Sequence, residues 1–186
     1  MTGQPQAADW QVVLRPLTEA DFTARYLAWF ADPEVTRFLD ARNISHADAI
    51  AHLRRGIETD SFRIYAICEA ATNLHVGNLK IGPMHHRHKT SDMITVIGER
   101  AAWGRGFARA AIRQGIDIAF RQLDIRKLSA SIDSRNTGSI KAYTAAGFAV
   151  ETSLKDHFIE TAPDGEVVFS DKVYVACFNP NFKAAE

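Results

Sequence analysis

The sequence has little of what marks several large classes of protein. Its 186 residues contain two cysteines, Cys68 and Cys177, six prolines and eleven glycines, and Lys+Arg 22 balance Asp+Glu 22. Two distant cysteines imply no disulfide framework, and so little glycine and proline excludes a collagen-like or low-complexity chain. Zero net charge argues against a general electrostatic grip on nucleic acid or on an anionic membrane.

Long apolar segments are also missing. No run approaches the ~18 apolar residues that span a bilayer, and residues 1–10 lack the apolar core and cleavage site of a signal peptide. Hydrophobic residues make up 46% and charged residues 24%, which is ordinary globular composition. We therefore expect a cytoplasmic protein with a single domain over residues 1–186 and no nucleic-acid or membrane partner.

The amino-terminal third reads as mostly helical. Thr18 with Asp21, and Ser45 with Asp48, match the capping pattern that begins a helix. Apolar residues follow both pairs at spacings of three and four, as on the buried face of a helix. The sequence predicts helices after each pair.

Strands and helices alternate along the rest of the chain. Strand patterns occupy segments 12–14, 63–69, 75–81, 93–97, 128–132, 148–154 and 167–178. Residues 83–90 and Pro163-Asp164-Gly165 are expected to form loops, and helical spacing covers 108–123 and 139–145. The sequence therefore predicts one mixed α/β (α+β) domain, with a sheet of about six or seven strands flanked by helices.

A glycine-containing loop joins the strand at 93–97 to the strongest helix. Gly104 and Gly106 let the backbone turn tightly and bring its N–H groups close to a ligand. The helix start adds unpaired donors and a positive dipole end, which suits a pyrophosphate. Full positive charges come from Arg100, Arg105 and Arg109. The alternative is a solvated turn that binds nothing.

Two familiar phosphate-binding patterns do not fit this loop. A P-loop needs Gly-Lys followed by Ser or Thr, and Gly106-Phe107-Ala108 does not supply it. A dinucleotide fingerprint needs a third glycine or alanine where Arg109 stands. Phosphates at this loop must be bound in another way.

Residues Trp103-Gly104-Arg105-Gly106-Phe107-Ala108 resemble the acetyl-CoA loop of the GCN5-related N-acetyltransferases, the GNAT superfamily. Tryptophan in the first position is typical of the branch that contains the ribosomal-protein amino-terminal acetyltransferases. Asn136, Tyr143 and Gly147-Phe148 then follow in the family order across 92–150. The resemblance implies a single GNAT domain with a mixed, mostly antiparallel sheet, and acetyl-CoA as co-substrate bound by about 92–150.

The resemblance also assigns residues to the cofactor. In the family the asparagine contacts the pantetheine arm and the tyrosine protonates the leaving thiolate. The expected cofactor-binding residues are Val96, Ile97, Gly98, Arg100, Trp103, Gly104, Arg105, Gly106, Phe107, Ala108, Arg109, Asn136 and Ser139. For Tyr143 the alternative is a helix aromatic that packs on the sheet.

Acetyl transfer to an amine requires an uncharged amine, a polarised carbonyl and a proton for the sulfur. A backbone N–H after Val96 could polarise the carbonyl, and a tyrosine hydroxyl is a suitable acid. Asp92 and Glu99 are candidates for the base, although Glu99 could simply cap a turn or pair with an arginine. Ser131 stands where some relatives place a carboxylate.

The acceptor is suggested by a narrower resemblance. Segments 26–35, 75–83, 139–143 and 155–158 look like those of GNAT enzymes that acetylate nucleotide-linked amino sugars. Candidates for the acceptor pocket are Asp32, Glu34, His85 with the loop to His88, and His157. Ordinary surface polarity or helix capping is the alternative for each. We expect no metal site, because adjacent histidines do not easily converge on one ion.

Three other activities stay open. The chain could acetylate the amino terminus of a ribosomal or other protein, or act as a non-catalytic acyl-CoA sensor. A polyamine acceptor is less attractive, because the acidic residues before residue 60 form no dense cluster. A homodimer is possible.

The zero net charge of the whole chain hides an uneven distribution of charge. Residues 100–141 hold nine basic and three acidic residues, a charge of +6 that leaves −6 elsewhere.

Overall fold

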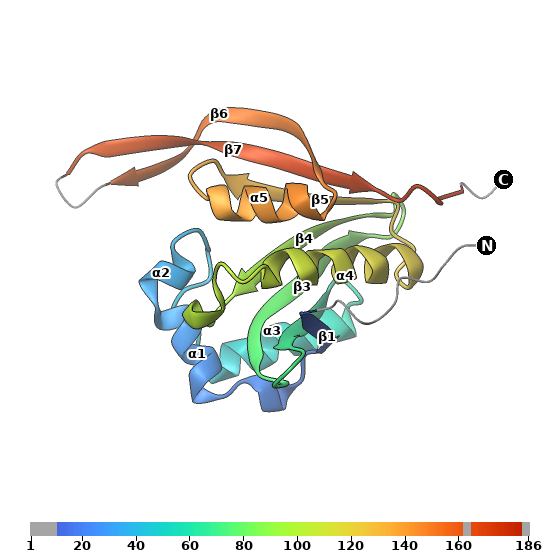
Figure 1. Cartoon of the computed structure of the whole chain (residues 1–186), viewed down its shortest axis with the longest axis horizontal. Coiled ribbons are helices and arrows are strands. Elements are labelled where there is room, and N and C mark those ends of the chain that lie inside the picture. The colour runs from blue at the N-terminus through green and yellow to red at the C-terminus, as the bar shows by residue number, and fades with distance from the viewer. Residues whose placement is uncertain (1–10, 162–164, 184–186) are drawn as a thin grey trace.

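The computed structural model describes residues 11–161 and 165–183, which form a seven-stranded sheet in the order β1-β2-β3-β4-β5-β7-β6 (Figure 1). The strands are β1 (Val12–Pro16), β2 (Arg63–Glu69), β3 (His75–His85), β4 (Thr90–Ile97), β5 (Lys127–Asp133), β6 (Ala149–Thr161) and β7 (Val167–Phe178). Neighbours pair antiparallel except β4 and β5, which run parallel. The predicted single α/β domain with a mixed, mostly antiparallel sheet is confirmed.

Helices cover both faces of the sheet. They are α1 (Ala24–Ala31), α2 (Pro33–Thr36), α3 (His46–Glu58), α4 (Phe107–Arg121) and α5 (Thr137–Ala146), with 3-10 turns η2 (Glu19–Asp21) and η3 (Arg100–Ala102). None of the described helices is long and apolar enough to cross a membrane.

Two hydrophobic cores lie on opposite faces, because successive side chains of a strand point to opposite sides. Ile67 of β2 joins the core under α4 and α5, whereas its neighbour Ala66 joins the core under α1 and α3. Gly115 lets α4 approach closely, since a Cβ there would lie 2.8 Å from Leu79 Cδ1. These two cores fix the central strands between two layers of helices.

The ends of α4 and α5 follow the local sequence. The buried positions of α4, among them Ala111, Ile112 and Gly115, keep the predicted spacing. Helix α5 begins after Asn136, whose side chain accepts a hydrogen bond from the Ser139 N–H at 3.1 Å. Both predicted helices are present, with boundaries shifted by one or two residues.

Two expected boundaries were wrong. The capping box of Thr18 and Asp21 is present, but it caps the short η2 turn, and α1 starts later at a Thr23 cap. The loop expected at 83–90 shrinks to a turn, because β3 and β4 continue pairing through His85 and Thr90. The polar side chains of this segment therefore belong largely to the solvent-accessible end of the β3–β4 pair and not to a long loop.

Strand β6 is longer than the predicted segment 148–154. It continues to Thr161 beyond a bulge at 155–157, across which Leu154 pairs with Lys172 and Phe158 with Ser170. The far end of the β6–β7 hairpin projects past the helices (Figure 1). Of the loop predicted at Pro163-Asp164-Gly165, the first two residues lie outside the described part of the chain.

Candidate active site

The parallel strands β4 and β5 separate like the arms of a fork. They pair only from Thr90 with Lys127 to Asp92 with Ser129, although β4 continues to Ile97 and β5 to Asp133. Main-chain groups along the diverging arms therefore have no strand partner inside the fork. A cleft of about 650 Å³ occupies the opening.

The cleft passes from one face of the sheet to the other. Met93 lines it from the core under α4, whereas Ile94, the next residue of β4, is 47% exposed on the opposite face. Side chains of α5 line the first side, and residues 37–42 with the β6–β7 hairpin line the second. Two molecules that enter from different faces could thus meet in the fork.

Tyr143 of α5 lies at the centre of the fork and is only 3% exposed. Its hydroxyl donates to the Met93 carbonyl at 2.9 Å and lies 3.3 Å from Thr95 Oγ1. The ring packs edge-to-face on Phe148. Burial raises the pKa of this phenol well above its ordinary value. The group is therefore protonated at neutral pH and able to donate a proton.

The loop before α4 presents its main chain to solvent. Gly104 and Gly106 adopt positive φ angles of 73° and 80°, which glycine takes up at no steric cost. The Trp103 indole donates to the Ile97 carbonyl at 2.8 Å and ties the loop to the end of β4. Among the described residues no side chain caps α4 at Gly106, so the first N–H groups of the helix are available to an anion.

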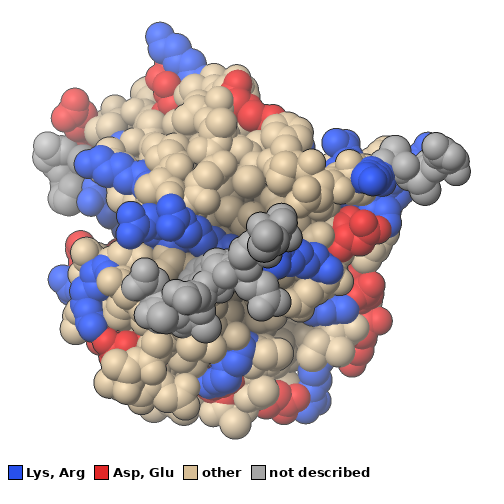
Figure 2. All heavy atoms as spheres, turned by 45° about the vertical axis from the view of Figure 1, so that its right-hand side comes forward, with Lys and Arg blue, Asp and Glu red and all other residues tan. Residues whose placement is uncertain are grey.

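The three arginines of the loop are not equally available. Arg105 forms an ion pair with Glu69, and Arg100 lies 3.7 Å from Asp32. Arg109 is exposed and has no acidic partner among the described residues. The loop therefore carries less uncompensated charge than its sequence suggests. Across one face of the molecule Lys and Arg side chains form a band (Figure 2).

The two candidate bases lie outside the residues that line the cleft. Asp92 sits where the strands part, and desolvation raises its pKa although the charges of His85 and Lys172 counteract this. Glu99 precedes the η3 turn, and its N–H donates to the Val76 carbonyl at 3.0 Å. That position fits a turn-forming role, and both assignments as a base stay predictions.

The four predicted acceptor residues are dispersed. Asp32 caps α2 by accepting from the Glu34 N–H at 2.9 Å, and Glu34 itself is exposed. His85 ends β3, and His157 lies in the β6 bulge with its ring edge-to-face on Phe158. None of the four lines the described cleft. Their role in binding an acceptor stays a prediction.

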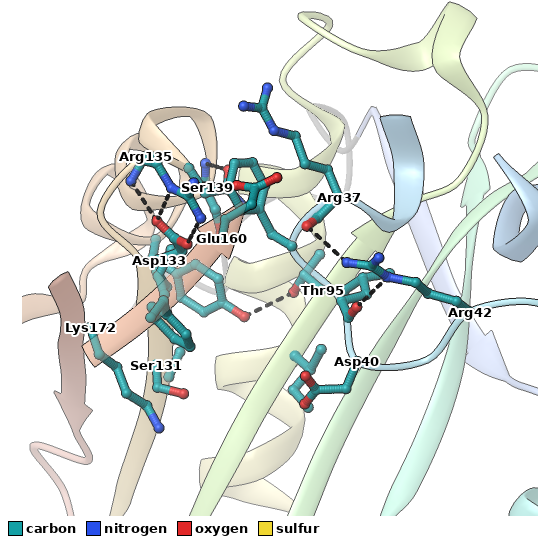
Figure 3. A pocket seen from close by; sticks show the side chains of 18 of the residues that line it. Arg37, Asp40, Arg42, Thr95, Ser131, Asp133, Arg135, Ser139, Glu160 and Lys172 are labelled. Carbon is teal, nitrogen blue, oxygen red and sulfur yellow. Dashed lines mark hydrogen bonds and ion pairs between the residues drawn. The ribbon is translucent and has the colours of Figure 1, made fainter. Parts of the chain in front are cut away.

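Apart from Ser131, sequence reasoning assigned no role to the residues that form the second side of the cleft. In Figure 3, Asp40 and Arg42 lie on one wall, and Ser131 and Lys172 lie on the other. The first wall is a short connection without helical or strand periodicity, and the second comes from β5 and the β6–β7 hairpin. Three charged residues within 37–42, namely Arg37, Asp40 and Arg42, were the one available signal.

An ion network fixes the hairpin side of the cleft. Arg135 binds both carboxylate oxygens of Asp133, at 3.1 and 2.7 Å, and also pairs with Glu160. Burial alone would raise the pKa of Asp133, but the hydrogen bonds from Arg135 outweigh it and lower that pKa. The carboxylates of Asp133 and Glu160 are therefore both paired with Arg135. In the described part of the chain, no three His, Cys, Asp or Glu side chains come together as metal ligands.

A family model described as "Acetyltransferase (GNAT) domain" matches residues 11–149 of the chain. An uncharacterized N-acetyltransferase, p20 of Bacillus licheniformis, is 25% identical over 76% of this chain and 79% of its own length. Spermidine N(1)-acetyltransferase of Vibrio cholerae is 24% identical over 55% of this chain and 58% of that protein.

Solved structures share the same fold. The crystal structure of spermidine N-acetyltransferase from Vibrio cholerae, in complex with CoA and spermine, superimposes with a TM-score of 0.78. The match covers 90% of this chain and 95% of that one, at 18% identity. At this identity the likeness concerns the fold rather than the acceptor.

Proposed function

The chain belongs to the GNAT acetyltransferase family and is an acetyl-CoA-dependent N-acetyltransferase, and we propose that its acceptor is the primary amine of a nucleotide-linked amino sugar. The observation that carries the proposal is a set of cations that line the cleft and form no ion pair with the described residues. The proposed transfer is a direct attack of the amine on the thioester.

The residues of the fork fit the co-substrate. The exposed main chain at Gly104 to Gly106 suits the phosphates. Apart from Gly104 and its two chain neighbours, no described residue has an atom within 4 Å of the place that a Gly104 Cβ would take. Asn136 uses its side-chain oxygen to cap α5, which leaves its NH2 group for the pantetheine arm. The co-substrate supplies an activated acetyl thioester. Tyr143 gives its proton to the departing sulfur as the amine takes over the acetyl group.

The cations of the cleft favour an acceptor that carries negative charge. Within the described residues Arg37, Arg42 and Lys172 have no ion-pair partner. Arg42 donates only to main-chain carbonyls, and the Lys172 ammonium lies 5.3 Å from the ring centre of Tyr174. A phosphate-bearing acceptor would compensate these charges, whereas a polyamine would bring like charges together.

Release of CoA thiol against a panel of acceptors tests the proposal. The panel contains nucleotide-linked amino sugars, peptides with free amino termini, and spermidine. We expect saturable release with at least one nucleotide-linked sugar, and weaker release with the same amino sugar lacking its nucleotide. Saturable release with a peptide or with spermidine, and none with any sugar, would overturn the proposed acceptor class.

We also propose that one domain spans residues 1–186, that the enzyme works in the cytoplasm, and that it forms a homodimer. Exposed apolar side chains on the hairpin support the dimer: Ile159 is 68%, Phe169 55% and Val167 48% exposed. Sedimentation of the wild type and of Phe169→Ser tests it, because loss of this patch should shift the mass toward the monomer.

A further inference from the structure

We infer that Asp40 is the residue that binds the ammonium of the acceptor and accepts its proton. The inference rests on the proposed function only in that the acceptor is an amine that enters the cleft. It adds a carboxylate that neither the sequence patterns nor the family resemblance indicated.

Asp40 is the uncommitted carboxylate of the cleft. Three acidic residues line it, and two of them, Asp133 and Glu160, are paired with Arg135. The Asp40 side chain is exposed and has neither a hydrogen bond nor an ion pair among the described residues. In Figure 3 it turns toward the strands of the fork, while Arg37 extends away from them.

The surroundings of Asp40 are positively charged. Arg37 and Arg42 lie on its own connection, and Lys172 faces it from β7. Arg135 with its two acids and the protonated Tyr143 complete the ionisable lining. An ammonium that enters the cleft is repelled by every unpaired charged side chain except Asp40. The position of this carboxylate thus selects where the amine binds, while the cations hold an anionic part of the acceptor.

The proton balance of the reaction is complete with Asp40 in this role. The ammonium loses one proton to an Asp40 oxygen, and the exposed carboxyl passes it to solvent. The neutral nitrogen forms its bond to the acetyl carbon as the carbon–sulfur bond breaks. Tyr143 protonates the sulfur, and the second nitrogen proton replaces the one that Tyr143 gave. An amide, a thiol and one released proton result.

The test compares Asp40→Asn, Asp40→Glu and the wild type over a range of pH, with whichever amine the wild type acetylates. Asp40→Asn should lose about 100-fold in kcat/KM for the amine near pH 7, the scale of a lost general base. The loss should shrink as pH rises toward the pKa of the amine itself, because free amine then needs no carboxylate. Asp40→Glu should keep the shape of the wild-type profile.

Two controls separate this role from a structural one. Glu58→Gln, at the end of α3, removes an exposed carboxylate away from the cleft and should leave the profile unchanged. Acetyl-CoA affinity and melting temperature of Asp40→Asn should match the wild type. The inference would be overturned if Asp40→Asn lost less than threefold in kcat/KM for the amine, or lost the same factor at every pH. Weaker binding of acetyl-CoA by this variant would overturn it as well. A peptide acceptor would refute the proposed sugar but leave this comparison decisive, and a wild type inactive with every amine would refute both.

Discussion

The two sides of the fork present different kinds of chemical group to the cleft. The side under α4 and α5 presents main-chain groups, shaped by Gly104 and Gly106, and one buried phenol, Tyr143. The opposite side presents charged side chains from the 37–42 connection and from the hairpin. Under the proposed function the first side binds the co-substrate and the second side the acceptor, and they are named the cofactor side and the acceptor side accordingly. The cofactor side could then serve any acceptor that the acceptor side admits.

This difference has an energetic counterpart. Main-chain donors are fixed by the fold and lose little entropy when a ligand binds, whereas long exposed side chains such as Arg42 must be ordered. The cofactor side is therefore hard to change without harm to the fold. The acceptor side can change its charges at little cost in stability.

The largest effect is expected at Tyr143, where the two sides meet. Tyr143→Phe removes the proton for the sulfur and should lower kcat by about 100-fold or more. It also leaves the buried Met93 carbonyl without its donor, at about 1 kcal/mol of stability. Stopped-flow release of CoA thiol and chemical denaturation measure the two effects. Wild-type turnover by this variant would remove Tyr143 from the mechanism.

The next effect should appear on the acceptor side alone. Arg42→Gln combined with Lys172→Gln should raise KM for the anionic acceptor by about tenfold for each lost charge–phosphate contact. Acetyl-CoA affinity, measured by calorimetry, should stay unchanged. Arg121→Gln, which removes one positive charge at the carboxyl end of α4, is the control for each of the two substitutions made singly. Equal losses in all variants would mean that overall charge, not the cleft, matters.

A smaller effect should appear on the cofactor side. Gly106→Ala forces a residue with a Cβ into the left-handed region at the start of α4, at a cost of about 1–2 kcal/mol. We expect about tenfold weaker acetyl-CoA binding and an unchanged acceptor KM once acetyl-CoA is saturating. A change confined to the acceptor would contradict the division between the two sides.

The smallest effect on catalysis is expected at Asp21, in the η2 turn that precedes α1. Burial opposes ionisation of Asp21, but hydrogen bonds from Arg15 and Thr18 lower its pKa to about 2. Because the folded pKa lies below the ordinary value of 3.8, this stabilisation is present above about pH 4 and is lost as pH falls toward 2. Its size is about 2 kcal/mol.

Asp21→Asn should therefore lower the free energy of unfolding at pH 7 and flatten its dependence on pH between 4 and 2. Denaturant titrations at several pH values measure this, with Asp124→Asn, an exposed carboxylate, as the control. Parallel pH curves for Asp21→Asn and the wild type would rule out the Arg15 pair as the source of acid sensitivity.

Sequence patterns predicted the loop and helices of the first side of the fork far better than the charged lining of the second side. The loop at 103–108 is contiguous, and the glycine spacing and helix periodicity around it are local signals. The extension of β3 and β4 was missed because polar residues there resemble a loop. Only the fold brings Lys172 into the same cleft as Asp40 and Arg42, and Arg135 reaches Glu160 across 25 residues. No local sequence pattern could predict that these distant residues come together in one cleft.

The opening of the cleft to both faces of the sheet has a consequence for steady-state kinetics. Two substrates that arrive from different faces need not wait for one another, so both can be bound when the acetyl group moves. Neither Cys68 nor Cys177 lines the cleft to carry the acetyl group between them. Double-reciprocal plots at several acceptor concentrations should therefore give intersecting lines rather than parallel ones.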